Sequence, residues 1–306
     1  MLLPFSLPRS SSGVLALVEA GAPAALVATA RSHVGAARTD ALKALHQITI
    51  GHQPPYVDVP CCIMSTYYGE DCAGGGPDFE QQHRRACREA SIAAGVVPAM
   101  LEVLLTGPVV EAARLACGIF IECRGYSEPT DERLAPAFVA ALREHTGDVV
   151  VCKFASYALA RHAVESAAAA DAAAAAGAIP ALVAALRSHL KDEDVSMCAC
   201  YAISEIARAS AGGCEAAIAA RAAPVLAAAF HMSHDDVQLK GRASRAFHAI
   251  AASSAEGKAA VIAASAVPLL VAAAKTYGAC KQFGDGKETF AEALSALGYA
   301  ADGTRA

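Results

Sequence analysis

The chain has 306 residues, of which 55% are apolar, and its formal net charge at pH 7 is −5. This apolar fraction is ample for a buried core, so the composition excludes a wholly disordered chain. No run of basic residues of the kind that follows a phosphate backbone occurs, which argues against a dedicated nucleic-acid-binding protein.

The chain opens with MLLPFSLPRSSSG, in which Pro4 and Pro8 interrupt a short apolar run that no basic residue precedes. This is a poor secretory signal, and we interpret residues 1–13 as an N-terminal tail. The 11 cysteines are spread over the chain, and most stand beside alanine. Free thiols packed as small apolar groups are typical of a reducing compartment, so we expect the cytoplasm, with the nucleus as an alternative.

A corner recurs along the chain, at which an alanine-rich helix ends and a second helix begins near a proline. In AAAADAAAAAGAIPALVAALRSHL, residues 167–190, Gly177 can adopt the left-handed conformation that closes a helix, and Pro180 loses nothing at a first helical position. Because Asp171, Gly177 and Pro180 interrupt this stretch, we expect no membrane span here.

The spacing of these corners indicates a repeat. Their prolines are Pro23, Pro98, Pro136, Pro180, Pro224 and Pro268. The last three intervals (180−136, 224−180 and 268−224) are each 44 residues, which is a strong signal for a helical repeat array.

One period predicts three helices. The first ends at Gly177, the second runs from about 180 to 189, and the third from about 195 to 209. Gly212-Gly213 is expected to close the unit.

The start and the buried side of the third helix are also readable. Asp192, Glu193 and Asp194 supply capping oxygens and negative charge at its start. Apolar residues at spacings of three and four predict one buried stripe, made of Cys198, Ala199, Ala202, Ile203 and Ile206.

The segment AAAGAIPALVAAL, followed by a third helix that carries YAISEIA, resembles the armadillo repeat, whose consensus is close to a Gly-Ala-Ile-Pro-x-Leu-Val corner and a later Ala-Leu-Ser-Asn-Leu-Ala. The resemblance implies an all-α fold, a right-handed α-α superhelix (solenoid) of about six three-helix repeats, with the third helices lining a concave groove. It covers residues 14–299 as a single solenoid domain, with irregular second and sixth repeats. Residues 300–306 are expected to be a C-terminal tail. Each repeat has too little core to stand alone, so neighbours must stack.

Residues 51–78, GHQPPYVDVPCCIMSTYYGEDCAGGGPD, differ from the rest and are predicted to form a loop between the first and second repeats. A solvated loop, a loop that contacts a partner or acts as a lid, and a metal site are all open alternatives. Cys61, Cys62 and Cys72, with Cys87 nearby, could offer soft ligands to zinc, although adjacent cysteines are awkward for a tetrahedral site. A metal-binding or catalytic role of residues 51–87 is therefore an alternative function, but we expect no cofactor.

The histidines and glycines form no catalytic pattern. His33, His145 and His189 recur with the array near the ends of second helices, where a histidine complements the helix macrodipole. The fragment from Gly284 to Lys287 lacks the upstream glycine and the following Ser or Thr of a phosphate-binding loop, and we interpret it as a turn before the last helix. We therefore predict a protein that is not an enzyme.

The resemblance also places two residues of each third helix in the groove. Nuclear-import receptors of the importin-α type carry a Trp-x-x-x-Asn pair there. The matching pairs in this chain are Lys43 and Gln47, Tyr157 and Arg161, Tyr201 and Glu205, and Arg245 and Ala249. The chain contains no tryptophan, and none of these positions is Asn, so a nuclear-transport adaptor is a disfavoured alternative. Phe120 is the candidate for the corresponding place in the second repeat.

Arginine forks and tyrosine rings in this predicted groove suit an extended segment that contains carboxylates. Glu205 interrupts the basic track, and ordinary surface residues are the alternative interpretation. We predict a protein-protein interaction scaffold or adaptor that binds an extended peptide or a partner helix in the groove. The expected partner is a protein or peptide, with an acidic one as the specific hypothesis. We expect neither a nucleic-acid partner nor a membrane span.

Overall fold

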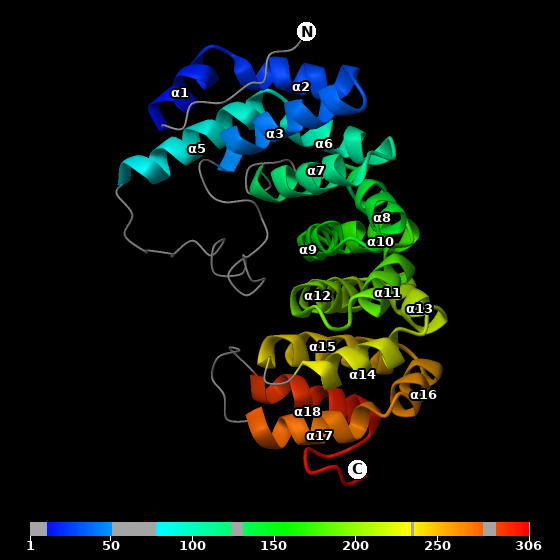
Figure 1. Cartoon of the computed structure of the whole chain (residues 1–306). Coiled ribbons are helices and arrows are strands. Elements are labelled where there is room, and N and C mark those ends of the chain that lie inside the picture. The colour runs from blue at the N-terminus through cyan, green and yellow to red at the C-terminus, as the bar shows by residue number, and fades with distance from the viewer. Residues whose placement is uncertain (1–10, 51–77, 124–130, 234–235, 278–285, 306) are drawn as a thin grey trace. The chain divides into compact units, whose positions relative to one another are not determined.

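The computed structural model describes residues 11–50, 78–123, 131–233, 236–277 and 286–305. The chain falls into two compact units, residues 1–133 (unit 1) and 134–306 (unit 2), which are described separately. Every regular element in these described ranges is an α-helix (Figure 1), which confirms the predicted all-α class. The single solenoid domain over residues 14–299 stays a prediction.

Unit 1 contains two three-helix repeats. They are α1 (Ser11–Glu19), α2 (Ala22–Ser32) and α3 (Ala36–Ile50), followed by α5 (Asp78–Ala93), α6 (Val96–Leu105) and α7 (Val110–Cys123). α2 packs on α6 and α3 packs on α7, so equivalent helices of the two repeats are neighbours. α1 begins at Ser11, within the segment predicted as the N-terminal tail. The predicted insertion lies outside the described residues, except for Asp78 at the start of α5.

Unit 2 repeats the same order of helices. They are α8 (Leu134–Glu144), α9 (Val149–Glu165), α10 (Ala167–Ala175), α11 (Ala178–Ser188), α12 (Glu193–Ala209), α13 (Ala211–Ala219), α14 (Ala222–Met232), α15 (Val237–Ser253), α16 (Ala255–Ala263), α17 (Ala266–Tyr277) and α18 (Gly286–Leu297). The third helices α9, α12, α15 and α18 pack in succession, as Figure 1 shows. The three helices predicted from residue 167 onward are confirmed as α10, α11 and α12.

Side-chain caps recur with the 44-residue period in unit 2. A serine caps each first helix and an aspartate caps each of α9, α12 and α15, because their oxygens accept the backbone N–H groups that the first turn leaves without partners. The capping residues are Ser166, Ser210 and Ser254, and Asp148, Asp192 and Asp236. Asp192 Oδ1 accepts the N–H of Val195 at 2.9 Å, which confirms the predicted start of the third helix.

The corner between first and second helices has the same left-handed backbone in three successive repeats. Gly177 has φ of 81°, as the sequence predicts for a residue that closes a helix. Arg221 and Ser265 occupy the equivalent positions with φ of 52° and 58°. Two repeats therefore keep the corner although the glycine is absent, at the cost of backbone strain.

The prediction that Gly212-Gly213 closes a repeat is wrong. Both glycines lie inside α13, and the repeat boundary falls at Ser210. Gly213 packs so closely on the end of α12 that an added Cβ would lie 2.6 Å from the carbonyl oxygen of Ile206. Glycine is needed at this position because two helices approach each other closely, and the chain makes no turn there.

The core of unit 2 follows the predicted stripe. Cys198, Ala199, Ala202, Ile203 and Ile206 are all fully buried on α12, which packs between α9 and α15. Small side chains at these positions let the helices approach closely, which is the close packing expected of protein interiors.

The C-terminal segment folds back onto the last repeat. Tyr299 and Arg305 form an isolated antiparallel bridge, and Gly303 lies against the side chain of Val271 on α17. The segment predicted as a C-terminal tail therefore contacts α17 at Gly303 and pairs with Tyr299 at Arg305.

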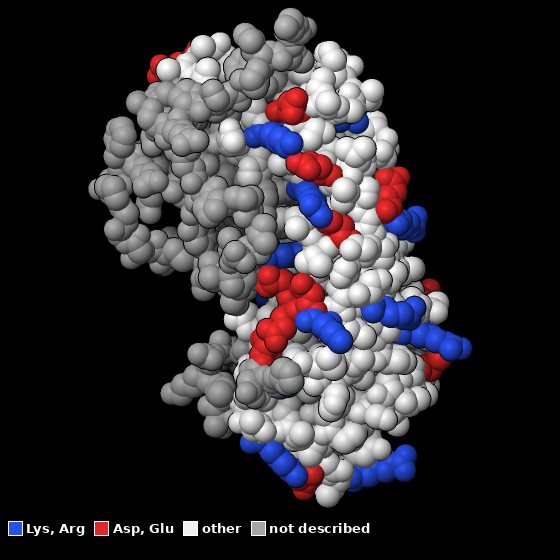
Figure 2. Space-filling view, in the orientation of Figure 1, with Lys and Arg blue, Asp and Glu red and all other residues white. Residues whose placement is uncertain are grey.

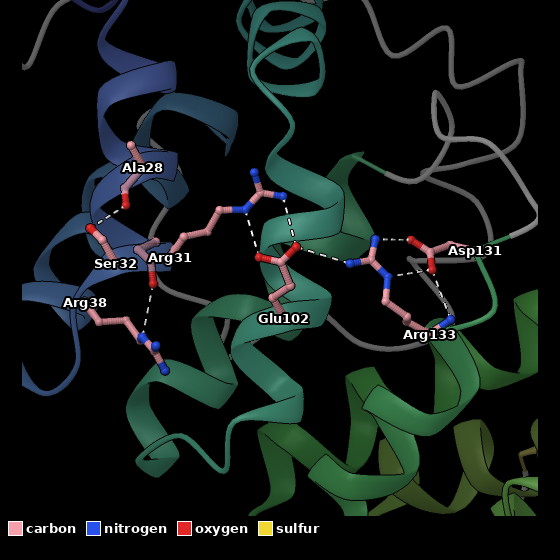
Figure 3. A network of polar contacts seen from close by, with 8 residues as sticks. Ala28, Arg31, Ser32, Arg38, Glu102, Asp131 and Arg133 are labelled. Atoms are coloured by element: carbon pink, nitrogen blue, oxygen red, sulfur yellow. Dashed lines mark hydrogen bonds and ion pairs between the residues drawn. The ribbon is translucent and has the colours of Figure 1, made fainter.

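A chain of charged side chains links the two repeats of unit 1 (Figure 3). Glu102 on α6 accepts from Arg31 on α2 and from Arg133, with nitrogen–oxygen distances of 2.9 and 3.2 Å. Arg133 is also paired with Asp131 at 2.8 Å, and this guanidinium holds the pKa of the Asp131 carboxyl below its usual range. These side chains are half exposed, so each pair contributes little stability and the network chiefly fixes how the two repeats align.

Candidate functional site

The surface with the predicted site residues of unit 2 is formed by three neighbouring third helices. We call the side of α9, α12 and α15 that carries Tyr157, Arg161, Tyr201, Glu205 and Arg245 the third-helix face. The 44-residue period brings these residues onto one side, because Tyr157, Tyr201 and Arg245 are equivalent in successive repeats. These residues lie on the side of each helix that the buried stripe does not occupy.

Aromatic and guanidinium groups stack along this face. The ring centroids of Tyr157 and Tyr201 are 6.5 Å apart with an interplanar angle of 46°. The guanidinium carbon of Arg242 on α15 lies 3.8 Å from the centroid of the Tyr201 ring, within the range of a cation–π contact. Tyr157 is 8% exposed, so it supports the stack more than it presents a free ring.

Arg242 is a residue of the candidate site that the sequence reasoning missed. Its equivalent position on α12 is Cys198, a buried residue of the stripe, so the period predicts a small apolar residue there. The signal that could have identified it is the arginine that stands at 242, where the preceding repeat has the small residue Cys198. Only a neighbouring helix reveals its partner.

Glu205 does not interrupt the positive charge of the face in the way the sequence suggested. Its carboxylate is buried and accepts two hydrogen bonds from Arg208, at 2.6 Å to Nη2 and 3.1 Å to Nε. The side chain of Arg208 is 57% exposed, so the pair turns its cationic member toward solvent. A charge that looks acidic in the sequence is therefore neutralised by the same helix, one turn later.

A second acid of this region is also paired. Asp194 in the first turn of α12 binds the ammonium of Lys153 on α9 at 2.5 Å. By contrast, Arg161 and Arg245 are exposed and have no ion pair or hydrogen bond to any residue in the described parts of the chain. The uncompensated charge at the predicted binding positions in unit 2 is thus positive.

In unit 1 the predicted residues Lys43 and Gln47 lie on α3 and are both exposed. The Lys43 ammonium is paired with Glu111 on α7 at 3.1 Å, and about half of each side chain is exposed. Figure 2 shows that basic and acidic side chains lie next to one another on the visible face of this unit. Lys43 therefore adds less uncompensated charge than the two free arginines of unit 2.

The suggestion that Phe120 takes the corresponding place in the second repeat is wrong. Phe120 is 1% exposed and belongs to the core. Matching the buried pattern of α7 to that of α9 places Gly118 and Glu122 at the equivalents of Tyr157 and Arg161. Glu122 is paired with Arg88 on α5 at 2.9 Å.

The described residues bring together no candidate metal site. Cys61, Cys62 and Cys72 lie outside the described ranges, and within those ranges no group of three or more potential metal ligands gathers. Cys87 is 2% exposed and packs with Val14 and Ile48, and burial raises the pKa of its thiol. A thiol in this apolar setting is a poor source of the thiolate that zinc requires.

The recurring histidines are found at the ends of second helices. His33 and His189 are the C-terminal caps of α2 and α11, and His145 directly follows α8. Nε2 of His189 lies 2.7 Å from the carbonyl oxygen of Thr146 in the preceding repeat. At His189 the imidazole therefore joins two successive repeats.

Within the described ranges no single helix is both long and apolar enough to cross a membrane, while three bent helix pairs meet the criterion by length and composition only.

In comparisons with known proteins, the chain matches solved structures. No protein-family model matches it, and neither does any curated protein. An engineered protein from the Northeast Structural Genomics Consortium is 20% identical with a TM-score of 0.60, over 90% of this chain and 96% of that chain. A designed armadillo repeat protein is 20% identical with a TM-score of 0.58, over 90% and 99% of the two chains.

A second designed armadillo repeat protein, in complex with the peptide (KR)4, is 19% identical with a TM-score of 0.52, over 90% of this chain and 98% of that chain. At these identities the likenesses show the fold alone. The fold is an armadillo-like helical repeat.

Proposed function

We propose that this chain, with its armadillo-like repeat fold, is a non-enzymatic protein-interaction module that binds an extended acidic peptide on the third-helix face of unit 2. The observation that carries the proposal is that the acidic side chains of this region are paired within the chain, whereas two of its arginines are not. Asp194 and Glu205 are already paired within the chain, whereas Arg161 and Arg245 are exposed and unpaired among the described residues. Guanidinium groups without partners are suited to bidentate binding of carboxylates.

The stacked rings favour this charge preference over a basic peptide. In a lysine-binding site the aromatic ring must offer a free face to the alkyl stem or ammonium of the ligand. Here Arg242 covers one face of Tyr201, and Tyr157 lies next to the same ring. A lysine of the peptide would have to displace an arginine and meet its charge, so the face disfavours lysine-rich ligands.

The helix spacing sets the distance between the two binding residues. Arg161 lies on α9 and Arg245 on α15, with α12 between them. Two steps of 8–10 Å between the axes of packed helices place Arg161 and Arg245 roughly 20 Å apart. An extended peptide advances about 3.3 Å per residue, so carboxylates about six residues apart would reach both guanidinium groups.

The test is fluorescence anisotropy with a fluorescein-labelled peptide whose two glutamates are separated by five serines. Comparison peptides carry the glutamates side by side, or lysines in place of the glutamates. Against the wild type we expect the spaced acidic peptide to bind most tightly. The double variant Arg161→Glu, Arg245→Glu should lose at least tenfold in affinity, since each site then repels the ligand.

The matched control is Arg143→Glu, Arg187→Glu, which makes the same charge change at exposed residues in the last turns of α8 and α11. This variant should bind as the wild type does. Equal losses in both double variants would show that only net charge matters, and preferential binding of the lysine peptide would contradict the proposal. Circular dichroism on each variant verifies that the helices are intact.

A further inference from the structure

An open hollow of about 540 Å³ lies between α15 and α18 in unit 2. Its wall consists of small side chains and two that can carry charge. The lining residues are His248 and Ala252 on α15, and Ala291, Glu292, Ser295 and Ala296 on α18.

The repeat register explains why the hollow forms at this pair of helices. Arg208 on α12 has Ala252 as its equivalent on α15. Glu205, the partner of Arg208, is likewise replaced by alanine, at Ala249 on α15 and, when the buried pattern of α18 is matched to that of α15, at Ala296 on α18. The ion pair that fills this place on α12 is therefore absent from α15 and α18, and alanine methyl groups line the space.

The hollow carries one uncompensated negative charge. Glu292 is exposed, and it has no ion pair or hydrogen bond to any other described residue. His248 faces it across the hollow, with an Nδ1 atom that is buried and has no partner among the described residues. No hydrogen bond in the described structure joins His248 to Ser295, so these side chains do not form an activated serine.

We propose that this hollow binds the side chain of an arginine or lysine residue, with the Glu292 carboxylate pairing the cationic end. Ala252, Ala291 and Ala296 supply apolar contact for the alkyl stem. Guanidinium and ammonium groups match an unpaired carboxylate, whereas an acidic side chain would be repelled there.

The inference rests on the proposed function in one respect, the register of the bound peptide. The hollow adjoins α15, which also carries Arg245, and it lies one helix beyond the carboxylate-binding arginines. A peptide that uses both features needs a cationic residue about three positions beyond the second carboxylate, at one helix step of 8–10 Å. The order of acidic and cationic residues in the peptide would then determine the direction in which the peptide runs along α9, α12, α15 and α18.

The hollow itself can be tested without any peptide. The full chain, labelled with ¹³C at alanine methyl groups, is titrated with Nα-acetyl-arginine amide and, separately, with Nα-acetyl-norleucine amide, which has an uncharged side chain. We expect saturable shifts of the Ala252, Ala291 and Ala296 methyl signals with the arginine probe and at least fivefold weaker binding of the norleucine probe. Equal binding of the two probes, or no shift of these methyl signals, would overturn the proposal.

Two variants locate the binding. Glu292→Gln should weaken the arginine probe at least fivefold and leave the norleucine probe unchanged, because it removes charge and keeps size. Ala252→Arg places in the hollow the residue that α12 carries at Arg208, and it should abolish binding of both probes. If Glu292→Gln retains full affinity for the arginine probe, the carboxylate is not the partner and the proposal is wrong.

The double variant Arg161→Glu, Arg245→Glu separates this inference from the proposed function. It should leave the methyl shifts with the arginine probe in place while acidic peptides no longer bind. If the wild type binds the arginine probe in the hollow but binds no acidic peptide, the proposed function fails and this inference stands. If the wild type binds the acidic peptide but the arginine probe shifts no methyl signal, this inference alone fails. Amide spectra of each variant confirm that the unit is folded.

Discussion

The ammonium of Lys153 on α9 lies 2.5 Å from Oδ2 of Asp194 on α12, and only 7% of the lysine side chain is exposed. This pair links two third helices beside the proposed binding face. Asp194→Asn should lower the free energy of unfolding by about 1–3 kcal/mol, because it leaves a buried ammonium without its carboxylate. Urea denaturation followed by circular dichroism measures the change.

The second variant in this cycle is the double change Lys153→Met, Asp194→Asn. It removes both charges and keeps an aliphatic side chain on α9, so it should recover most of the lost stability. If the double variant were no more stable than Asp194→Asn alone, the loss would come from another contact of Asp194.

A second prediction concerns the left-handed corner residues Arg221 and Ser265. A residue with a Cβ in this conformation costs about 1–2 kcal/mol, while the extra freedom that glycine adds to the unfolded chain costs about 0.4–1 kcal/mol. The strain is the larger effect, so Arg221→Gly and Ser265→Gly should each raise the free energy of unfolding by about 0.5–1 kcal/mol. Urea denaturation of the single variants measures it.

The opposite change at Gly177 serves as the control. Gly177→Ala puts a Cβ in the left-handed conformation, and that atom would lie 2.5 Å from Nη2 of Arg143. It should destabilise the protein by about 1 kcal/mol or more. Glycine variants at 221 and 265 that are less stable than the wild type would mean that local contacts of the native side chains outweigh the strain.

The residues that the sequence predicted well depend on local physics. The 44-residue period, the Gly177 corner and the Asp192 cap each follow from backbone conformations and hydrogen bonds within a few residues. The stripe around Ile203 follows from helical periodicity alone. These features recur in each repeat, so several copies support the same interpretation.

The residues that the sequence could not place depend on neighbours from other helices. Arg242 was missed because its partner, Tyr201, belongs to the preceding repeat. Gly213 was misread as a turn because only the packed structure shows the carbonyl of Ile206 next to it. The hollow at Glu292 is a difference between repeats, and a consensus pattern averages such differences away.

The third prediction tests the register of the core. Ile203 on α12 is fully buried, and Ile203→Ala should lower the free energy of unfolding by about 2–4 kcal/mol through lost burial and the cavity that remains. Ile203→Val should cost only about 1 kcal/mol. Arg187→Ala, at an exposed position in the last turn of α11, should change stability by no more than about 0.5 kcal/mol. A loss below 0.5 kcal/mol for Ile203→Ala would place this residue outside the core.

The last prediction concerns pH and His46 on α3. Burial lowers the pKa of this imidazole to about 4, whereas its usual value is about 6.5. As the pH falls from 6.5 to 4, the unfolded chain therefore binds a proton at His46 that the folded chain does not. Stability is fully present above pH 6.5, and it should decrease by about 3 kcal/mol at most over this interval.

The measurement is urea denaturation at several pH values from 7.5 to 4.5 for the wild type and for His46→Gln. The other histidines and the carboxylates titrate in both proteins, so the difference between the two curves isolates His46. That difference should shrink as the pH falls, because the wild type alone loses the contribution of a neutral buried imidazole. Parallel curves would contradict the prediction, since they would mean that His46 binds its proton equally in the folded and unfolded chains.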